Sequence, residues 1–190
     1  MKTIWYHNEI KIANELQLLA TNLTQEFLNV NPDYFTLYSK GVNYSIPNEE
    51  VYVADANIWK TESLRYVNTD KKIETNFFEQ EQIIKNYPTA VTLTKKYIQH
   101  CGCSGYSSIE PNSKINAHTD IENTDQKFVR IHIPLFIPQG ETYFDVCGTR
   151  VYWSNIFAFD NSKTHSAHNN TNQRRLIYII DISREFLNIT

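Results

Sequence analysis

Residues 128–137 read FVRIHIPLFI, and this stretch is the clearest strand signal in the chain. Its odd-numbered positions are Val, Ile, Ile, Leu and Ile, which would give an extended strand one wholly apolar face. The opposite face carries Arg130 and His132 between two phenylalanines. Because burying an unpaired guanidinium is costly, we expect an anionic partner for Arg130. A structural salt bridge is the alternative to a functional site here.

Upstream of this strand lies a pair of candidate metal ligands, His118 and Asp120. On an extended chain the side chains at i and i+2 point the same way, so one strand edge could hold both. His165 follows the β-rich run 157–160, which would deliver a third ligand to a sheet edge. Two histidines and a carboxylate are typical of non-haem Fe(II) sites with open coordination positions. The His-x-Asp pair alone is a weak signal that usually marks a surface turn.

The ligand types narrow the choice of metal. Imidazole and carboxylate suit iron, manganese or zinc better than calcium. A structural zinc site usually has a fourth protein ligand, often cysteine, and none is suitably spaced.

Cys101, Cys103 and Cys147 form no plausible disulfide framework, and Cys101-Gly102-Cys103 lacks the spacer of a thioredoxin-like motif. We therefore expect ordinary thiols.

A second arginine, Arg175, precedes the very apolar run 176–182. Its side chain is well shaped to bind a carboxylate through two parallel hydrogen bonds. Together with Arg130 it suggests a dianionic ligand near the metal. The neighbouring Arg174 should face the other way and is expected to be a solvated surface residue.

Several segments in order resemble the aspartyl/asparaginyl β-hydroxylase family of Fe(II)- and 2-oxoglutarate-dependent oxygenases. The resemblance spans about Tyr87 to Asp181, half of the chain. The segments that carry it are Ser107 to Asp120, Arg130 to Leu135, Trp153 to Ser162, His165 to Asn169, Arg175 to Ile177, and Asp181. The ordered set is far more specific than any one motif.

The resemblance implies that Fe(II) binds to His118, Asp120 and His165. It implies that Arg175 and Ser107 hold the distal carboxylate of 2-oxoglutarate. It also places Arg130 and His132 near the carboxylate and keto end that chelates the metal.

Asp120 is present here, whereas the animal protein-modifying members of the family look as though they have lost the corresponding carboxylate ligand. In this respect the chain is similar to bacterial members that include free-proline hydroxylases. The resemblance therefore gives less reason to expect that this chain shares the substrate of the animal enzymes. His168 is interpreted as lying near the metal or the substrate without being a ligand.

The charge and hydropathy of the sequence limit the kinds of partner that we expect. The 190 residues contain 18 Lys and Arg against 21 Asp and Glu, a net charge of −3, and no basic run, which argues against nucleic acid. The first seven residues lack the apolar core of a leader, and no stretch is apolar for long enough to span a bilayer. We therefore expect a cytoplasmic protein without a membrane anchor. Residues 1–190 are expected to form a single domain.

Helices are predicted to come first and strands later. Apolar residues recur at helical spacing from Ile12 to Phe27 and predict a helix that ends near Pro32. This stripe is expected to pack on a sheet, and a homodimer contact is the alternative. A second helix is expected around 77–84, and a third from Pro88 to Gly102. Short strands are expected between 34 and 70, notably 51–54.

These patterns predict a mainly β fold of the α+β class. Residues 1–100 would supply helices and short strands, and residues 101–190 the half that carries the metal site. The resemblance implies a double-stranded β-helix, the jelly roll also found in cupins, with the N-terminal helices buttressing one outer face. The strand pattern is compatible with this.

The function implied by the resemblance is oxidative. With 2-oxoglutarate and O2 as cosubstrates, the chain would hydroxylate an unactivated C–H bond of an amino acid or of an aspartyl- or asparaginyl-type residue in a peptide. One alternative is a cupin-like metal enzyme that does not use 2-oxoglutarate, and another is an inactive jelly-roll binding module.

Substrate identity does not follow from the sequence. Four aromatic residues lie where the mouth above the metal could form, although such residues are more often core: Tyr44, Tyr52, Trp59 and Tyr66. Lys60 and Arg65 are candidates to meet a substrate carboxylate, with solvated side chains as the alternative.

Overall fold

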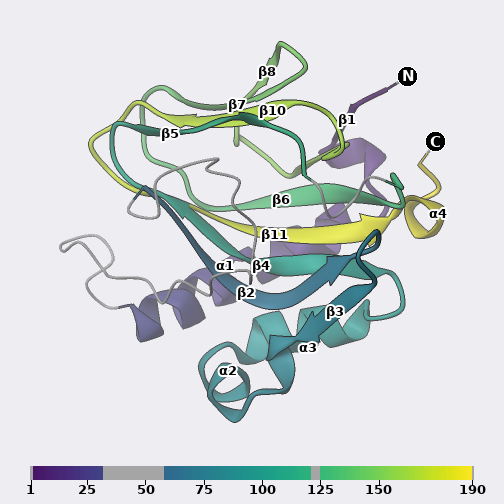
Figure 1. The fold of residues 1–190 in the computed structure, drawn as a ribbon. Coiled ribbons are helices and arrows are strands. Elements are labelled where there is room, and N and C mark those ends of the chain that lie inside the picture. The colour runs from purple at the N-terminus through teal and green to yellow at the C-terminus, as the bar shows by residue number, and fades with distance from the viewer. Residues whose placement is uncertain (1, 32–57, 121–124, 190) are drawn as a thin grey trace.

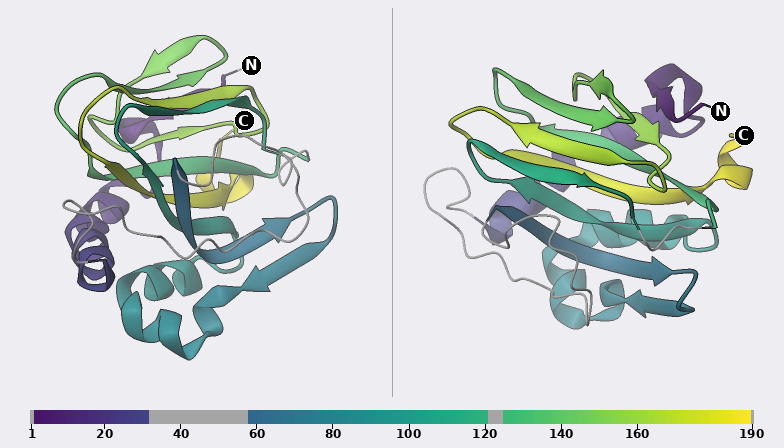
Figure 2. Two further views of the ribbon diagram at one scale, coloured as in Figure 1. Left: turned by 60° about the vertical axis from the view of Figure 1, so that its left-hand side comes forward. Right: turned by 45° about the horizontal axis from the view of Figure 1, so that its top comes forward.

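The described residues form two antiparallel β-sheets packed face to face, with helices on the outer side of the larger sheet (Figure 1). The computed structural model describes residues 2–31, 58–120 and 125–189. This is the predicted jelly roll, and the two further views of Figure 2 show the smaller sheet lying over the larger one. The predicted strand at 51–54 and the aromatics Tyr44 and Tyr52 lie outside the described residues.

The larger sheet has the strand order β1-β9-β6-β11-β4-β2-β3. Its strands are β1 (Ile4–Tyr6), β2 (Trp59–Asn68), β3 (Ile73–Asn76), β4 (Cys101–Ile109), β6 (Phe128–Phe136), β9 (Phe157–Phe159) and β11 (Arg175–Ser183). The smaller sheet has the order β5-β10-β7-β8. Its strands are β5 (Ser113–His118), β7 (Thr142–Val146), β8 (Thr149–Val151) and β10 (His165–Asn169).

The helices are α1 (Ala13–Val30), α2 (Glu81–Asn86), α3 (Pro88–Lys96) and α4 (Arg184–Leu187), with 3-10 turns η1 (His7–Glu9) and η2 (Phe77–Glu79). The first helix ends where the sequence predicted. The third begins at Pro88 as expected but ends at Lys96, so the prediction that Gly102 closes it is wrong. Gly102 lies in β4, where its backbone joins the sheet. No helix among the described residues is long and apolar enough to cross a membrane.

Two apolar clusters lie on opposite sides of the larger sheet. The outer cluster joins Leu16 and Leu23 of α1 to Ile131 of β6. The inner cluster lies between the sheets and includes Phe144 of β7 and Phe159 of β9. Alternation along β6 explains the division, because the odd-numbered residues face the helices while Arg130 and His132 face the inner space.

Glu26 ties the helices to the sheet. Its two carboxylate oxygens accept hydrogen bonds from the backbone N–H groups of Thr89 and Ala90, at 2.8 and 2.9 Å. These donors belong to the first turn of α3, where no intrahelical acceptor exists. The Tyr106 hydroxyl of β4 donates to the same carboxylate at 2.6 Å. One buried side chain therefore connects α1, α3 and the centre of the larger sheet.

Candidate metal centre

Three potential metal ligands meet at the rim between the sheets. His118 is the last residue of β5, His165 is the first of β10, and the two are directly paired across the strands. Asp120 follows β5, and its backbone N–H donates to the carbonyl of Asn161 at 3.0 Å. One donor atom from each of the three residues lies within 4.8 Å of the others. The structure therefore brings the predicted triad together.

The orientation of both imidazoles suits a metal ion. Nδ1 of His118 lies 2.7 Å from the carbonyl of Asn116, and Nδ1 of His165 lies 2.8 Å from that of Lys163. A carbonyl only accepts, so each Nδ1 carries a proton, and in the neutral ring each Nε2 presents its lone pair. Both Nε2 atoms lie 3.5 Å from Oδ1 of Asp120. This donor set fits a divalent transition metal such as Fe(II), with positions left for other ligands.

Asp120 is held so that a single oxygen faces the imidazoles. Its other oxygen, Oδ2, accepts hydrogen bonds from Arg130 at 2.5 Å and from the Asn161 amide at 3.0 Å. Burial alone would raise the pKa of Asp120, but the positive charge of Arg130 holds that pKa well below its usual value. The carboxylate is therefore ionised and pre-oriented for a cation.

Arg130 is bound by two acids of the protein. Besides Asp120, it donates to both oxygens of Asp181 on the adjacent strand β11, at 2.7 and 2.8 Å. Asp181 also accepts from the backbone N–H of Cys103 at 3.3 Å. Burial raises the pKa of Asp181, and Arg130 opposes that effect. The anionic partner expected for Arg130 is thus confirmed, and the arginine bridges a buried acid to a candidate metal ligand.

A narrow cavity of about 40 Å³ adjoins the triad. The side chains around it come from both sheets and include every other predicted cosubstrate residue: Ser107, Arg130, His132 and Arg175. Trp59 also lines it, and its ring lies 6.4 Å from that of His118. The Trp59 indole N–H donates to the Ser107 hydroxyl at 3.0 Å.

Arg175 and His132 are both buried beside this cavity. Arg175 is only 1% exposed, and its Nη1 donates to the Ser107 carbonyl at 3.4 Å. Burial and the nearby charges of Arg175 and Arg130 lower the pKa of His132 well below its usual value. The cavity therefore combines a permanent cation with a neutral imidazole, which suits a ligand that carries carboxylate and carbonyl groups.

Three side chains at this site were not assigned from the sequence: Asn161, Asp181 and Trp153. An acid within the apolar run of β11 was the available signal for Asp181. Nothing in the local sequence indicates that Asn161 reaches Asp120, because the contact depends on how the chain turns between β9 and β10.

The structure contradicts the expectations for Arg174 and His168, and it excludes the solvated alternative for Lys60 and Arg65. Arg174 is buried and pairs with Glu110 at 2.8 Å, and Lys60 pairs with the same acid at 3.3 Å, so neither is solvated. Arg65 is buried and pairs with Glu74 at 2.9 Å. His168 stacks on Tyr143 at 4.5 Å on the outer face of β10, away from the cavity. The reason is alternation, because the neighbouring Ala167 faces the inner cluster.

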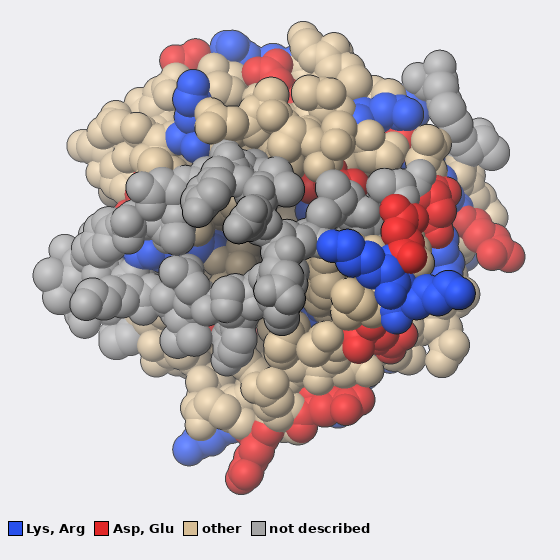
Figure 3. Space-filling view, viewed as in Figure 1, with Lys and Arg blue, Asp and Glu red and all other residues tan. Residues whose placement is uncertain are grey.

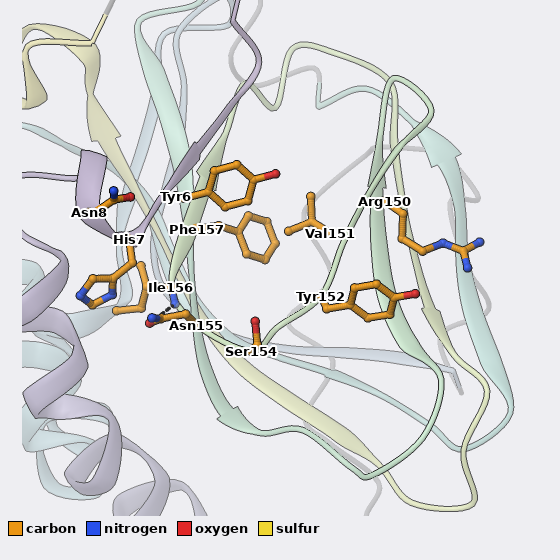
Figure 4. A pocket seen from close by; sticks show the side chains of 10 residues that line it. All are labelled: Tyr6, His7, Asn8, Arg150, Val151, Tyr152, Ser154, Asn155, Ile156 and Phe157. Carbon is orange, nitrogen blue, oxygen red and sulfur yellow. Dashed lines mark hydrogen bonds between the residues drawn. The ribbon is translucent and has the colours of Figure 1, made fainter.

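A larger hollow of about 520 Å³ lies elsewhere, between β1 and the connection from β8 to β9 (Figure 4). The labelled side chains include Tyr6, Arg150 and Tyr152, and His7 is the one candidate metal ligand among them. The charged residues on the face shown in Figure 3 intermingle in sign over the part of the chain that is described. Among the described residues, the triad is the one group of three or more His, Cys, Asp or Glu side chains that could hold a metal ion.

A jelly roll that carries two histidines and a carboxylate at one rim, with a cation-lined cavity beside them, defines a mononuclear non-haem metal protein. The family model for aspartyl/asparaginyl β-hydroxylase matches residues 12–185. The chain therefore belongs to the aspartyl/asparaginyl β-hydroxylase family, whose members are 2-oxoglutarate-dependent non-haem iron hydroxylases.

Solved structures with related folds are distant. An oxidoreductase of the 2OG-Fe(II) oxygenase family from Burkholderia pseudomallei is 11% identical, with 69% of this chain and 71% of that chain covered and a TM-score of 0.46. A predicted oxalate decarboxylase from Thermotoga maritima is 16% identical, with coverages of 47% and 73% and a TM-score of 0.37. At these values the likenesses bear on neither substrate nor mechanism. No curated protein matches the chain.

Proposed function

We propose that this protein uses Fe(II), 2-oxoglutarate and O2 to hydroxylate an unactivated C–H bond. The substrate would be an amino acid or an aspartyl- or asparaginyl-type residue within a peptide. The observation that carries the proposal is the proximity of the intact His118, Asp120 and His165 cluster to the buried Arg175. A metal site alone would need no buried arginine in the adjoining cavity.

In this proposal His118, Asp120 and His165 hold the iron. When bound, the iron would supply the redox chemistry that converts substrate, O2 and 2-oxoglutarate to hydroxylated product, succinate and carbon dioxide. Two neutral imidazoles and one carboxylate leave a net positive charge on a divalent ion, which favours a dianionic cosubstrate. The residues around the cavity exclude bulk water from this ligand, because most are apolar or already hydrogen-bonded.

Arg175 and Ser107 would bind the distal carboxylate of 2-oxoglutarate. The Arg175 guanidinium already lies against the Ser107 backbone, so both groups are in place before a ligand arrives. His132 would donate to the carboxylate nearer the metal. Arg130 would contribute its positive charge there while it holds Asp120, because its guanidinium is bound by Asp120 and Asp181.

The experiment that tests the proposal supplies Fe(II)-loaded protein with 2-oxoglutarate and O2. Free amino acids are compared with peptides that contain Asp or Asn. We expect succinate and a product 16 mass units heavier to form together with one of these classes, and Asp120→Asn to abolish both. Product formed without 2-oxoglutarate would favour the cupin-like alternative. Neither product nor succinate with any substrate would favour the binding module.

Cytoplasmic location, a homodimer contact through α1, and the absence of nucleic-acid and membrane partners stay predictions from the sequence.

A further inference from the structure

Trp153 lies in the connection between β8 and β9 and is only 3% exposed. The residues on either side, Tyr152 and Ser154, line the outer hollow, as Figure 4 shows. Trp153 points the opposite way and belongs to the inner cluster between the sheets. One short connection therefore places a buried indole against His132 and Arg175, two side chains that line the cavity beside the metal centre.

The indole fixes the state of His132. Its Nε1–H donates to Nδ1 of His132 at 3.1 Å. An indole nitrogen is a donor only, so Nδ1 must be the unprotonated nitrogen. The pKa of His132 is lowered by burial and by the charge of Arg175, so the ring is neutral and its proton is on Nε2. Nε2–H is then the donor that His132 can offer to the cavity.

Aromatic rings keep His132 in this position. The rings of Phe144, Phe157 and Phe159 have their centroids 4.8, 5.0 and 5.1 Å from that of the imidazole. This apolar surround disfavours rotation of the ring and leaves the indole as the polar group that sets the tautomer.

The same indole contacts Arg175. The guanidinium carbon of Arg175 lies 4.8 Å from the centroid of the Trp153 ring, within the range of a cation–π interaction. His132 comes from β6 and Arg175 from β11, and both line the cavity. Trp153 therefore connects two cavity side chains that belong to different strands.

We propose that Trp153 is a positioning residue that prepares the cavity for a dicarboxylate. It would hold His132 as the neutral Nε2–H tautomer, a hydrogen-bond donor, and would fix the plane of the Arg175 guanidinium. This inference rests on the proposed use of 2-oxoglutarate for its ligand. The tautomer itself can be measured without any ligand.

The test uses Zn(II)-loaded protein, a diamagnetic stand-in for the iron form. Long-range proton–nitrogen NMR spectra report the protonation of each imidazole nitrogen, and a His132→Gln variant assigns the signal of His132. In the wild type at pH 7 we expect the neutral Nε2–H tautomer. A neutral Nδ1–H tautomer or a charged His132 in the wild type would overturn the proposal whether or not any variant folds.

Trp153→Phe keeps an aromatic ring beside Arg175 but removes the N–H donor. We expect His132 to become a mixture of tautomers and the affinity for 2-oxoglutarate, measured by calorimetry, to fall about tenfold. In the iron form the KM for 2-oxoglutarate should rise while kcat changes little. An unchanged tautomer and unchanged affinity would overturn the proposal.

Trp5→Phe is the matched control. Trp5 is also buried, contacts an arginine, Arg184, at 5.3 Å, and belongs to the outer cluster. The Trp5→Phe variant should lose about as much stability as Trp153→Phe, without a change in the His132 tautomer or in the affinity for 2-oxoglutarate. If wild-type protein binds no 2-oxoglutarate although His132 shows the expected tautomer, the proposed function fails while the effect of Trp153 on His132 stands.

Discussion

The individual residue that defines the metal centre is Asp120. Its Oδ1 faces both imidazoles because Arg130 and Asn161 occupy Oδ2. A carboxylate bound in this way needs no rearrangement to accept a cation, which favours tight binding. The side chain thus combines a structural role, as a partner of a buried arginine, with a role as a ligand.

Asp120→Asn keeps the shape of the side chain and removes its charge. We expect Fe(II) affinity to fall by at least about 100-fold, more than the loss of an outer partner of a metal ligand typically causes. The fold should persist because Arg130 retains Asp181. Metal content after dialysis and circular dichroism measure the two effects. Wild-type iron content in the variant would remove Asp120 from the ligand set.

Asp181→Asn tests whether the hydrogen bonds between Asp181 and Arg130 contribute to metal binding, because Arg130 also binds the candidate ligand Asp120. It leaves Arg130 with a single buried acid, so we expect a stability loss of about 2–4 kcal/mol and a decrease in Fe(II) affinity of roughly tenfold. Urea unfolding and competition with a chelator measure these quantities. Glu110→Gln is the matched control, because it breaks another buried ion pair, with Arg174. A control that lost as much metal affinity as Asp181→Asn would contradict the specific role of Asp181.

At the scale of secondary-structure elements, the junction of α1 and α3 depends on one carboxylate. Glu26→Ala would leave two N–H groups of α3 and the Tyr106 hydroxyl without their acceptor. We expect the free energy of unfolding to fall by about 2–4 kcal/mol. Thermal and urea unfolding measure the loss.

Glu15→Ala on the same helix provides the comparison. Glu15 forms a more exposed pair with Lys96, at 2.6 Å, and accepts one hydrogen bond from the Tyr97 hydroxyl at 2.9 Å, so its loss should cost less than that of Glu26, about 1 kcal/mol. Equal losses in the two variants would refute the special role of Glu26.

The strands that carry the site show how far sequence patterns reach. The alternation in β6 predicted that Arg130 and His132 share an inner face, and the structure confirms it. The identity of the acid that binds Arg130 was not predictable, because Asp181 lies 51 positions away and the pairing of β6 with β11 brings them together. The triad was predictable because the His-x-Asp pair occurs within an ordered set of segments that resembles one family, although the pair alone is a weak signal.

The two adjacent arginines show the limit of the same rule. Alternation correctly indicated that Arg174 and Arg175 face opposite ways. It did not indicate that the Arg174 side chain is also buried, because its burial depends on the ion pair with Glu110, the residue that follows β4. Helix α3 shows a similar limit. The sequence predicted that it begins at Pro88 but not that it ends at Lys96.

At the scale of the whole molecule, the helical layer against the larger sheet gives stability an unusual pH dependence. Burial raises the pKa of Glu62 on β2 to about 7, and a hydrogen bond with Tyr87 offsets the effect only partly. The folded protein therefore binds a proton more tightly there than the unfolded chain does. This contribution to stability is complete below the unfolded pKa and is lost as the pH rises through the folded pKa.

We accordingly expect Glu62→Gln to remove a decline in the free energy of unfolding between pH 5 and pH 7. The decline should be about 1–2 kcal/mol, a figure reduced for solvent screening because Glu62 is partly exposed. Urea unfolding at the two pH values measures it. Glu81→Gln, at an exposed position on α2, should leave the decline in place. A wild-type protein that gains stability over this range through Glu62 would contradict the expected sign.

The central claim is that Arg175 and the triad serve one cosubstrate. The most direct measurement is an anaerobic titration of Fe(II)-loaded protein with 2-oxoglutarate that follows the visible metal-to-ligand charge-transfer band. It compares wild type with Arg175→Lys, which keeps the charge but loses the two-donor fork. We predict that the band appears in the wild type and that the variant needs at least about tenfold more 2-oxoglutarate. Bound iron with no band, or a titration unaffected by the substitution, would contradict the account.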